Sequence, residues 1–113
     1  METPRCLIVT QDRFLARLLD LLLDHGEYER RVLSDARAAT RDIEAWRPHL
    51  AILDIDIDDG HGIDLVHGWK ARGGTLPIIG VTRRKTIEAR LGAFEHGIDD
   101  LLVIPCRGSP RAF

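Results

Sequence analysis

The sequence predicts a doubly wound α/β domain, in which helices cover both faces of a parallel β-sheet. Three observations support this fold class: short apolar runs recur along the chain, amphipathic stretches separate them, and glycine or proline ends most of these stretches. Wholly apolar runs are typical of strands buried on both faces, and intervening helices connect parallel strands. A length of 113 residues, with 44% hydrophobic and 30% charged residues, fits one ordinary globular domain.

Five strands are predicted from the apolar runs. In chain order they span residues 6–9, 28–33, 50–55, 77–82 and 101–104. The second of them, YERRVL, is more polar than the others and fits a strand at a sheet edge. Five strands that alternate with helices suit the flavodoxin-like strand order 2-1-3-4-5.

Four helices connect these strands, and each is recognised by apolar residues at helical spacing. These residues are Phe14, Leu15, Leu18, Leu19 and Leu22 in the first helix, Ala36, Ala39, Ile43 and Trp46 in the second, Ile63, Val66 and Trp69 in the third, and Ile87, Leu91 and Phe94 in the fourth. The expected helix ends are Gly26, Arg47–Pro48, Gly73–Gly74 and Gly97. Ser34 or Asp35 caps the second helix, and Gly60 and Gly62 make a turn before the third.

An acidic run lies where this fold binds ligands. The run contains Asp54, Asp56, Asp58 and Asp59, and it directly follows the third strand. In open parallel sheets the functional crevice lies beyond the carboxyl ends of the strands. The residues after the first strand (10–12), together with Thr82, Arg83, Ile104 and Pro105 after the last two strands, belong to the same edge.

Two common ligand sites do not fit this edge. A calcium loop that began at Asp54 would need glycine at its sixth position and glutamate at its twelfth, where the chain has Asp59 and Leu65. The loop TQDRF after the first strand contains no glycine to bring the backbone against a phosphate, which argues against a flavin or nucleotide site.

Three segments of the chain form a recognisable set, namely LAILDIDIDDGHGIDL, PIIGVT and HGIDDLLVIP. Together they resemble the receiver domains of bacterial two-component response regulators. The segment LAILDIDIDDGHGIDL resembles their phosphoacceptor strand and turn, PIIGVT their fourth strand, and HGIDDLLVIP the approach to their fifth strand. The resemblance covers residues 5–105. It implies that Asp54 is the phosphoacceptor, that Asp56 offers its backbone carbonyl to Mg²⁺, that Thr82 contacts the phosphoryl group, and that Pro105 follows a cis peptide bond.

The chain departs from the receiver pattern where charge must be neutralised. Thr10 and Gln11 replace the acidic pair that holds Mg²⁺, and Asp12 could serve only if its loop shifts. Ile104 replaces the lysine that pairs with the phosphoryl group, and Leu101 replaces the aromatic switch residue. With Asp12, Asp54 and Asp56 as the remaining candidate ligands, Mg²⁺ binding is expected to be weak or absent. Asp58 or Asp59 could compensate for the missing ligands, and Arg83 or Arg84 could replace the lysine.

The expected function is that of a signalling receiver in a two-component type pathway. Asp54 is its candidate phosphoacceptor, and a sensor histidine kinase or a phosphotransfer protein is a candidate partner. The alternative is a phosphorylation-independent pseudo-receiver that acts as a protein-interaction or dimerisation module. A small metal-dependent phosphotransfer enzyme is a third class, but the sequence offers no general base or substrate pocket signature, so we expect a protein that is not an enzyme.

The remaining expectations concern the domain boundaries, the partners and the cellular location of the protein. Residues 1–105 are expected to form the receiver-like domain, in which the fifth helix of receivers is missing or truncated. Residues 106–113 (CRGSPRAF) form a short tail, which is either the start of a linker or a truncated fifth helix. We expect the uncovered side around the fourth helix, fifth strand and tail to mediate a homodimer or a partner contact. A net charge of −2 gives no electrostatic footprint for nucleic acid. The absence of a membrane-spanning apolar run favours a cytoplasmic protein.

Overall fold

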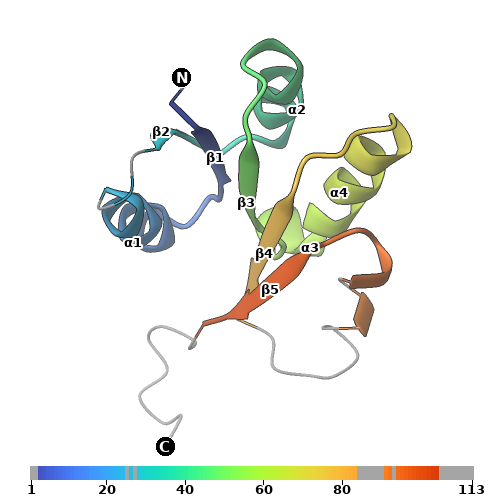
Figure 1. Cartoon of the computed structure of the whole chain (residues 1–113). Helices are drawn as coiled ribbons and strands as arrows, with labels where there is room; N and C mark the ends of the chain where they lie inside the picture. The colour runs from blue at the N-terminus through green and yellow to red at the C-terminus, as the bar shows by residue number, and fades with distance from the viewer. Residues whose placement is uncertain (1–2, 25, 27, 84–90, 93, 105–113) are drawn as a thin grey trace, which may run out of the picture.

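The computed structural model describes residues 3–24, 26, 28–83, 91–92 and 94–104, and Figure 1 shows their arrangement. Five parallel strands form one sheet in the order β2-β1-β3-β4-β5, which confirms the predicted fold class and strand order. The strands are β1 (Arg5–Val9), β2 (Glu29–Leu33), β3 (Leu50–Asp54), β4 (Ile78–Thr82) and β5 (Asp100–Val103).

The helices agree with the sequence pattern except after β3. They are α1 (Arg13–Leu23), α2 (Ala36–Ala45), α3 (Ile57–Gly60) and α4 (Gly62–Ala71). The predicted turn at Gly60 and Gly62 is wrong, because α3 is a short helix and Gly62 is the first residue of α4. The buried side chain of Ile57 draws this segment against the core. Residues 91–92 and 94–95 are helical, but most of the predicted fourth helix lies outside the described residues.

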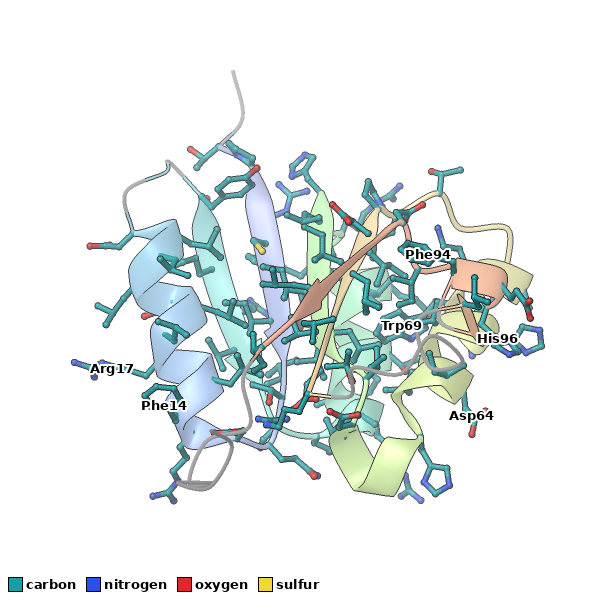
Figure 2. The ribbon with its side chains drawn as sticks, turned by 90° about the horizontal axis from the view of Figure 1, so that it is seen from below. Phe14, Arg17, Asp64, Trp69, Phe94 and His96 are labelled. Carbon is teal, nitrogen blue, oxygen red and sulfur yellow. The ribbon has the colours of Figure 1, made fainter. Side chains whose placement is uncertain are left out.

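The three central strands β1, β3 and β4 are buried on both faces, and alternate residues of these strands pack into opposite layers. In β1, Cys6 and Ile8 join a cluster with Leu15 and Leu19 of α1. The intervening residues of β1 join the cluster formed with α2, α3 and α4. This alternation follows from the two-residue period of a strand, and it explains why the central strands are almost wholly apolar. Figure 2 shows Arg17 of α1 directed away from the sheet.

Aspartate side chains cap two helices and set where they begin. Asp35, one of the two predicted candidates, accepts a hydrogen bond from the backbone N–H of Arg37 at 3.1 Å at the start of α2. Asp12 caps α1, and its Oδ1 accepts from the N–H groups of Phe14 and Leu15 at 2.9 and 3.1 Å. Such caps satisfy N–H groups that have no partner within the helix.

The start of α4 is packed directly against the backbone that follows β3. A Cβ atom added at Gly62 would lie 2.6 Å from the Cα atom of Ile55. Glycine is therefore required for α4 to approach this closely. The close approach fixes the position of the loop that carries Asp56, between β3 and α4. No helix in the described part of the chain is long and apolar enough to cross a membrane.

Candidate functional site

Three neighbouring strands bring the predicted polar residues to one edge of the sheet. Asp54 is the last residue of β3, Thr82 is the last residue of β4, and Thr10 directly follows β1. All three are buried, with exposed fractions of 5%, 0% and 2% respectively. Buried polar groups need hydrogen-bond partners, so the contacts among them decide what this edge can do.

Both carboxylate oxygens of Asp54 accept hydrogen bonds. The Thr10 hydroxyl donates to Oδ2 at 2.7 Å, and the backbone N–H of Asp56 donates to Oδ1 at 3.0 Å. The Thr10 hydroxyl oxygen also accepts from the N–H of Asp12 at 3.1 Å. Thr10 therefore ties the loop after β1 to the candidate phosphoacceptor.

Asp56 joins the ends of β3 and β4 through its side chain. The Thr82 hydroxyl lies 3.2 and 3.3 Å from the two carboxylate oxygens of Asp56, and the N–H of Arg83 donates to Oδ2 at 3.1 Å. The backbone carbonyl of Asp56, which the resemblance offers to a metal, accepts from the N–H of Gly60 at 3.3 Å at the start of α3.

The Arg83 guanidinium lies among all three candidate metal ligands. Its Nη2 is ion-paired and hydrogen-bonded to Asp12 Oδ2. Its Nη1 lies 3.7 Å from Asp54 Oδ1 and 3.6 Å from Asp56 Oδ2, within ion-pair range. One positive charge therefore faces three carboxylates. The sequence-based suggestion that Arg83 or Arg84 could supply a cation here agrees with this placement for Arg83, whereas Arg84 lies outside the described residues.

Asp12 has a lowered pKa in this setting. Burial of its carboxyl group acts to raise the pKa. The opposing effects are larger together: hydrogen bonds from the N–H groups of Leu15 and Phe14 and the charge and hydrogen bond of Arg83 favour the ionised form. The net shift keeps Asp12 ionised, as a helix cap and as the partner of Arg83.

The donor set of this edge does not suit Mg²⁺ as it is arranged. Mg²⁺ requires oxygen ligands with free lone pairs in near-octahedral geometry. Here the carboxylates of Asp12, Asp54 and Asp56 already accept from hydroxyl, amide and guanidinium groups. Across the described ranges, no group of three or more His, Cys, Asp or Glu side chains is arranged to hold a metal ion.

The other predicted residues are less central to the edge. Gln11 is exposed beside β1, and Leu101 lies within β5, packed against the core. The backbone N–H of Ile104 donates to the Thr82 carbonyl at 2.9 Å, and its apolar side chain brings no charge. The cis peptide bond expected before Pro105 and the tail 106–113 lie outside the described residues, as do the side chains of Asp58 and Asp59.

Sequence reasoning missed the role of Thr10. It treated Thr10 only as the replacement of an acidic ligand, whereas the structure makes it the hydrogen-bond donor to Asp54. A signal was available, because a hydroxyl at the end of a buried strand must find a partner and Asp54 ends the neighbouring strand β3.

Comparison with known proteins identifies a common domain. The model of the response regulator receiver domain family matches residues 6–109 of the chain. Over 105 residues the chain is 28% identical to the transcriptional regulatory protein PrrA of Mycobacterium leprae, which covers 93% of the chain and 45% of PrrA. It is 30% identical over 101 residues to the transcriptional regulatory protein BasR of Escherichia coli, covering 89% of the chain and 46% of BasR. The chain therefore spans about half the length of these curated relatives.

Solved structures show the same fold. The signal receiver domain of a putative Luxo repressor protein from Vibrio parahaemolyticus superposes with a TM-score of 0.84 at 24% identity, covering 97% of this chain and 85% of that one. A CheY-like response regulator receiver domain protein from Methanospirillum hungatei superposes with a TM-score of 0.79 at 27% identity, covering 97% and 86%.

Proposed function

The chain belongs to the response regulator receiver domain family of two-component signalling, and from this premise we propose that it signals by binding protein partners, without Mg²⁺-dependent phosphorylation of Asp54. The observation that carries the proposal is the Arg83 guanidinium among Asp12, Asp54 and Asp56. In this proposal the domain is a phosphorylation-independent pseudo-receiver and not an enzyme.

The charged groups around Asp54 support this function. Transfer of a phosphoryl group to a carboxylate requires cations that neutralise the charge on the phosphoryl oxygens. The carboxylates of Asp12 and Asp56, which could bind a metal ion beside Asp54, accept hydrogen bonds from Arg83 instead. Ile104 replaces the lysine that the receiver pattern expects. Access is also restricted, because Asp54 is only 5% exposed and both of its oxygens accept hydrogen bonds.

The partner surface that we propose lies on the β5 side of the sheet. β5 is an edge strand, and Leu102 within it is 48% exposed. Leu91 and Phe94, from the helical residues that precede β5, are also exposed apolar side chains. All three lie on β5 or on the segment that leads into it, and exposed apolar surface favours protein contacts. A second copy of the chain, a sensor histidine kinase or a phosphotransfer protein is the kind of partner we propose for this side.

A second candidate function retains Asp54 as the phosphoacceptor. One specific observation favours it: the Arg83 guanidinium lies 3.7 Å from Asp54 Oδ1 and so places a positive charge where a phosphoryl group would gather negative charge. The buried Thr82 hydroxyl also ends the adjacent strand. Under this alternative Arg83 would take the place of the missing lysine.

Intact-mass measurement separates the two candidates. The wild-type chain and Asp54→Asn are incubated with acetyl phosphate, with and without Mg²⁺, and a receiver with an intact acidic pair is the positive control. We expect no phosphoryl adduct on the wild-type chain under conditions that modify the control. An adduct on the wild type that is absent from Asp54→Asn would contradict the proposed function and establish the second candidate.

A further inference from the structure

Both the backbone and the side chain of Arg83 contact the acidic residues at this edge of the sheet. Its backbone N–H donates to Asp56 Oδ2 at 3.1 Å, and its guanidinium pairs with Asp12 and lies within 3.7 Å of Asp54 and 3.6 Å of Asp56. The Arg83 side chain is 24% exposed, so part of the contact is shielded from water. Shielding strengthens an ion pair relative to one at the open surface.

The guanidinium contacts the oxygens that a metal ion would need. These are Oδ2 of Asp12, Oδ1 of Asp54 and Oδ2 of Asp56. A planar guanidinium presents N–H donors to them, whereas a divalent cation requires their lone pairs. A divalent cation at these oxygens would also lie close to the guanidinium and be repelled by its charge, so Arg83 and a metal ion compete for this edge.

Like charges explain why some cation must be present at this edge. Asp54 ends β3, Asp56 directly precedes α3 and Asp12 caps α1, and unneutralised carboxylates that are close enough to share one guanidinium repel one another. Arg83 follows β4 directly, so the fold itself delivers the positive charge.

We propose that Arg83 is a built-in cation that holds the three carboxylates together and excludes divalent metal ions from them. The inference deepens the proposed function, because it names the group that takes the place of the metal. The domain then keeps one arrangement of its acidic edge whatever the divalent-ion concentration around it.

Manganese binding tests the inference on the whole chain. Mn²⁺ prefers the same oxygen ligands as Mg²⁺, and binding removes the electron paramagnetic resonance signal of the free ion. The titration compares the wild type with Arg83→Ala and with Arg17→Ala, the control, because Arg17 is an exposed arginine of α1. We expect Arg83→Ala to bind Mn²⁺ at least about tenfold more tightly than the wild type, the order expected when a charged hydrogen bond no longer competes. Arg17→Ala should match the wild type.

Equal Mn²⁺ affinity of the wild type and Arg83→Ala would overturn the inference. Should Arg83→Ala fail to fold, Arg83→Gln is titrated by the same criterion, because it removes the guanidinium and its charge but keeps a polar side chain. A different measurement tests the proposed function. A phosphoryl adduct on Asp54 would contradict that function even in a chain that excludes Mn²⁺. Tight Mn²⁺ binding by the wild type would contradict the inference even if no adduct forms.

Discussion

The side chain of Thr10 shows how one substitution changes the chemistry of the acidic edge. A carboxylate at this position would add a negative charge beside Asp54, whereas the Thr10 hydroxyl donates a hydrogen bond to it at 2.7 Å. The same hydroxyl accepts from the N–H of Asp12 and steadies the residue that caps α1. The edge is therefore built from hydrogen-bonded side chains and one arginine.

Replacement of Thr10 by valine tests the importance of this hydrogen bond. Valine has nearly the same shape, but it leaves Asp54 Oδ2 without its buried donor. We expect Thr10→Val to lower the free energy of unfolding by about 1–3 kcal/mol, the usual cost of an unsatisfied buried acceptor. Chemical denaturation measures the change. Thr75→Val is the control, because Thr75 is exposed, and an equal loss in both variants would contradict the assigned role of Thr10.

At the residue scale, sequence reasoning was most successful where strand ends fix positions. Asp54 and Thr82 end adjacent parallel strands, so their closeness followed from the predicted strand order. The reach of Arg83 was predicted only as one of two options, because a long side chain can point in many directions from a loop. Contacts decide that direction, and single residue types do not encode them.

At the element scale, the segment after β3 differs most from the sequence-based expectation. Glycine at 60 and 62 predicted a turn, but α3 and α4 form here instead. Gly60 has a φ of 100° and ends α3, so it uses the conformational freedom of glycine at a helix end. Gly62 serves packing, because α4 begins against the backbone of Ile55. Composition alone does not separate these two uses of glycine.

Two glycines of α4 provide a matched test of that packing. We expect Gly62→Ala to cost about 1–3 kcal/mol of stability, because its Cβ would meet the Ile55 backbone at 2.6 Å. Gly68→Ala should instead stabilise the chain by about 0.5–1 kcal/mol, because nothing lies within 4 Å of the added Cβ and alanine favours helix. Thermal unfolding of both variants measures the difference. Destabilisation of equal size in both would contradict the proposed packing.

At the scale of the whole molecule, the fold followed from periodicity and the site only in part. Two-sided burial makes the central strands continuously apolar, and this signal is strong in a single sequence. The strand order then brings Asp54, Thr82 and the loop after β1 to one edge. The sequence pattern could not predict which cation lies at that edge, because the same carboxylates can bind a metal ion or a guanidinium.

Arg83 therefore supplies one positive charge to the three carboxylates of the acidic edge from within the chain. Its effect on the whole domain is that phosphodonors and Mg²⁺ should leave the structure unchanged. A receiver that responds to phosphorylation instead needs an edge that reorganises when charge arrives.

Amide NMR of the ¹⁵N-labelled chain, recorded before and after addition of Mg²⁺ and beryllofluoride, tests this claim most directly. Beryllofluoride binds an aspartate carboxylate as a mimic of the phosphoryl group. We expect the amide signals of Asp54, Asp56, Thr82 and Arg83 to stay in place. Saturable shifts at these residues, absent from Asp54→Asn, would contradict the account and show a receiver that still responds at Asp54.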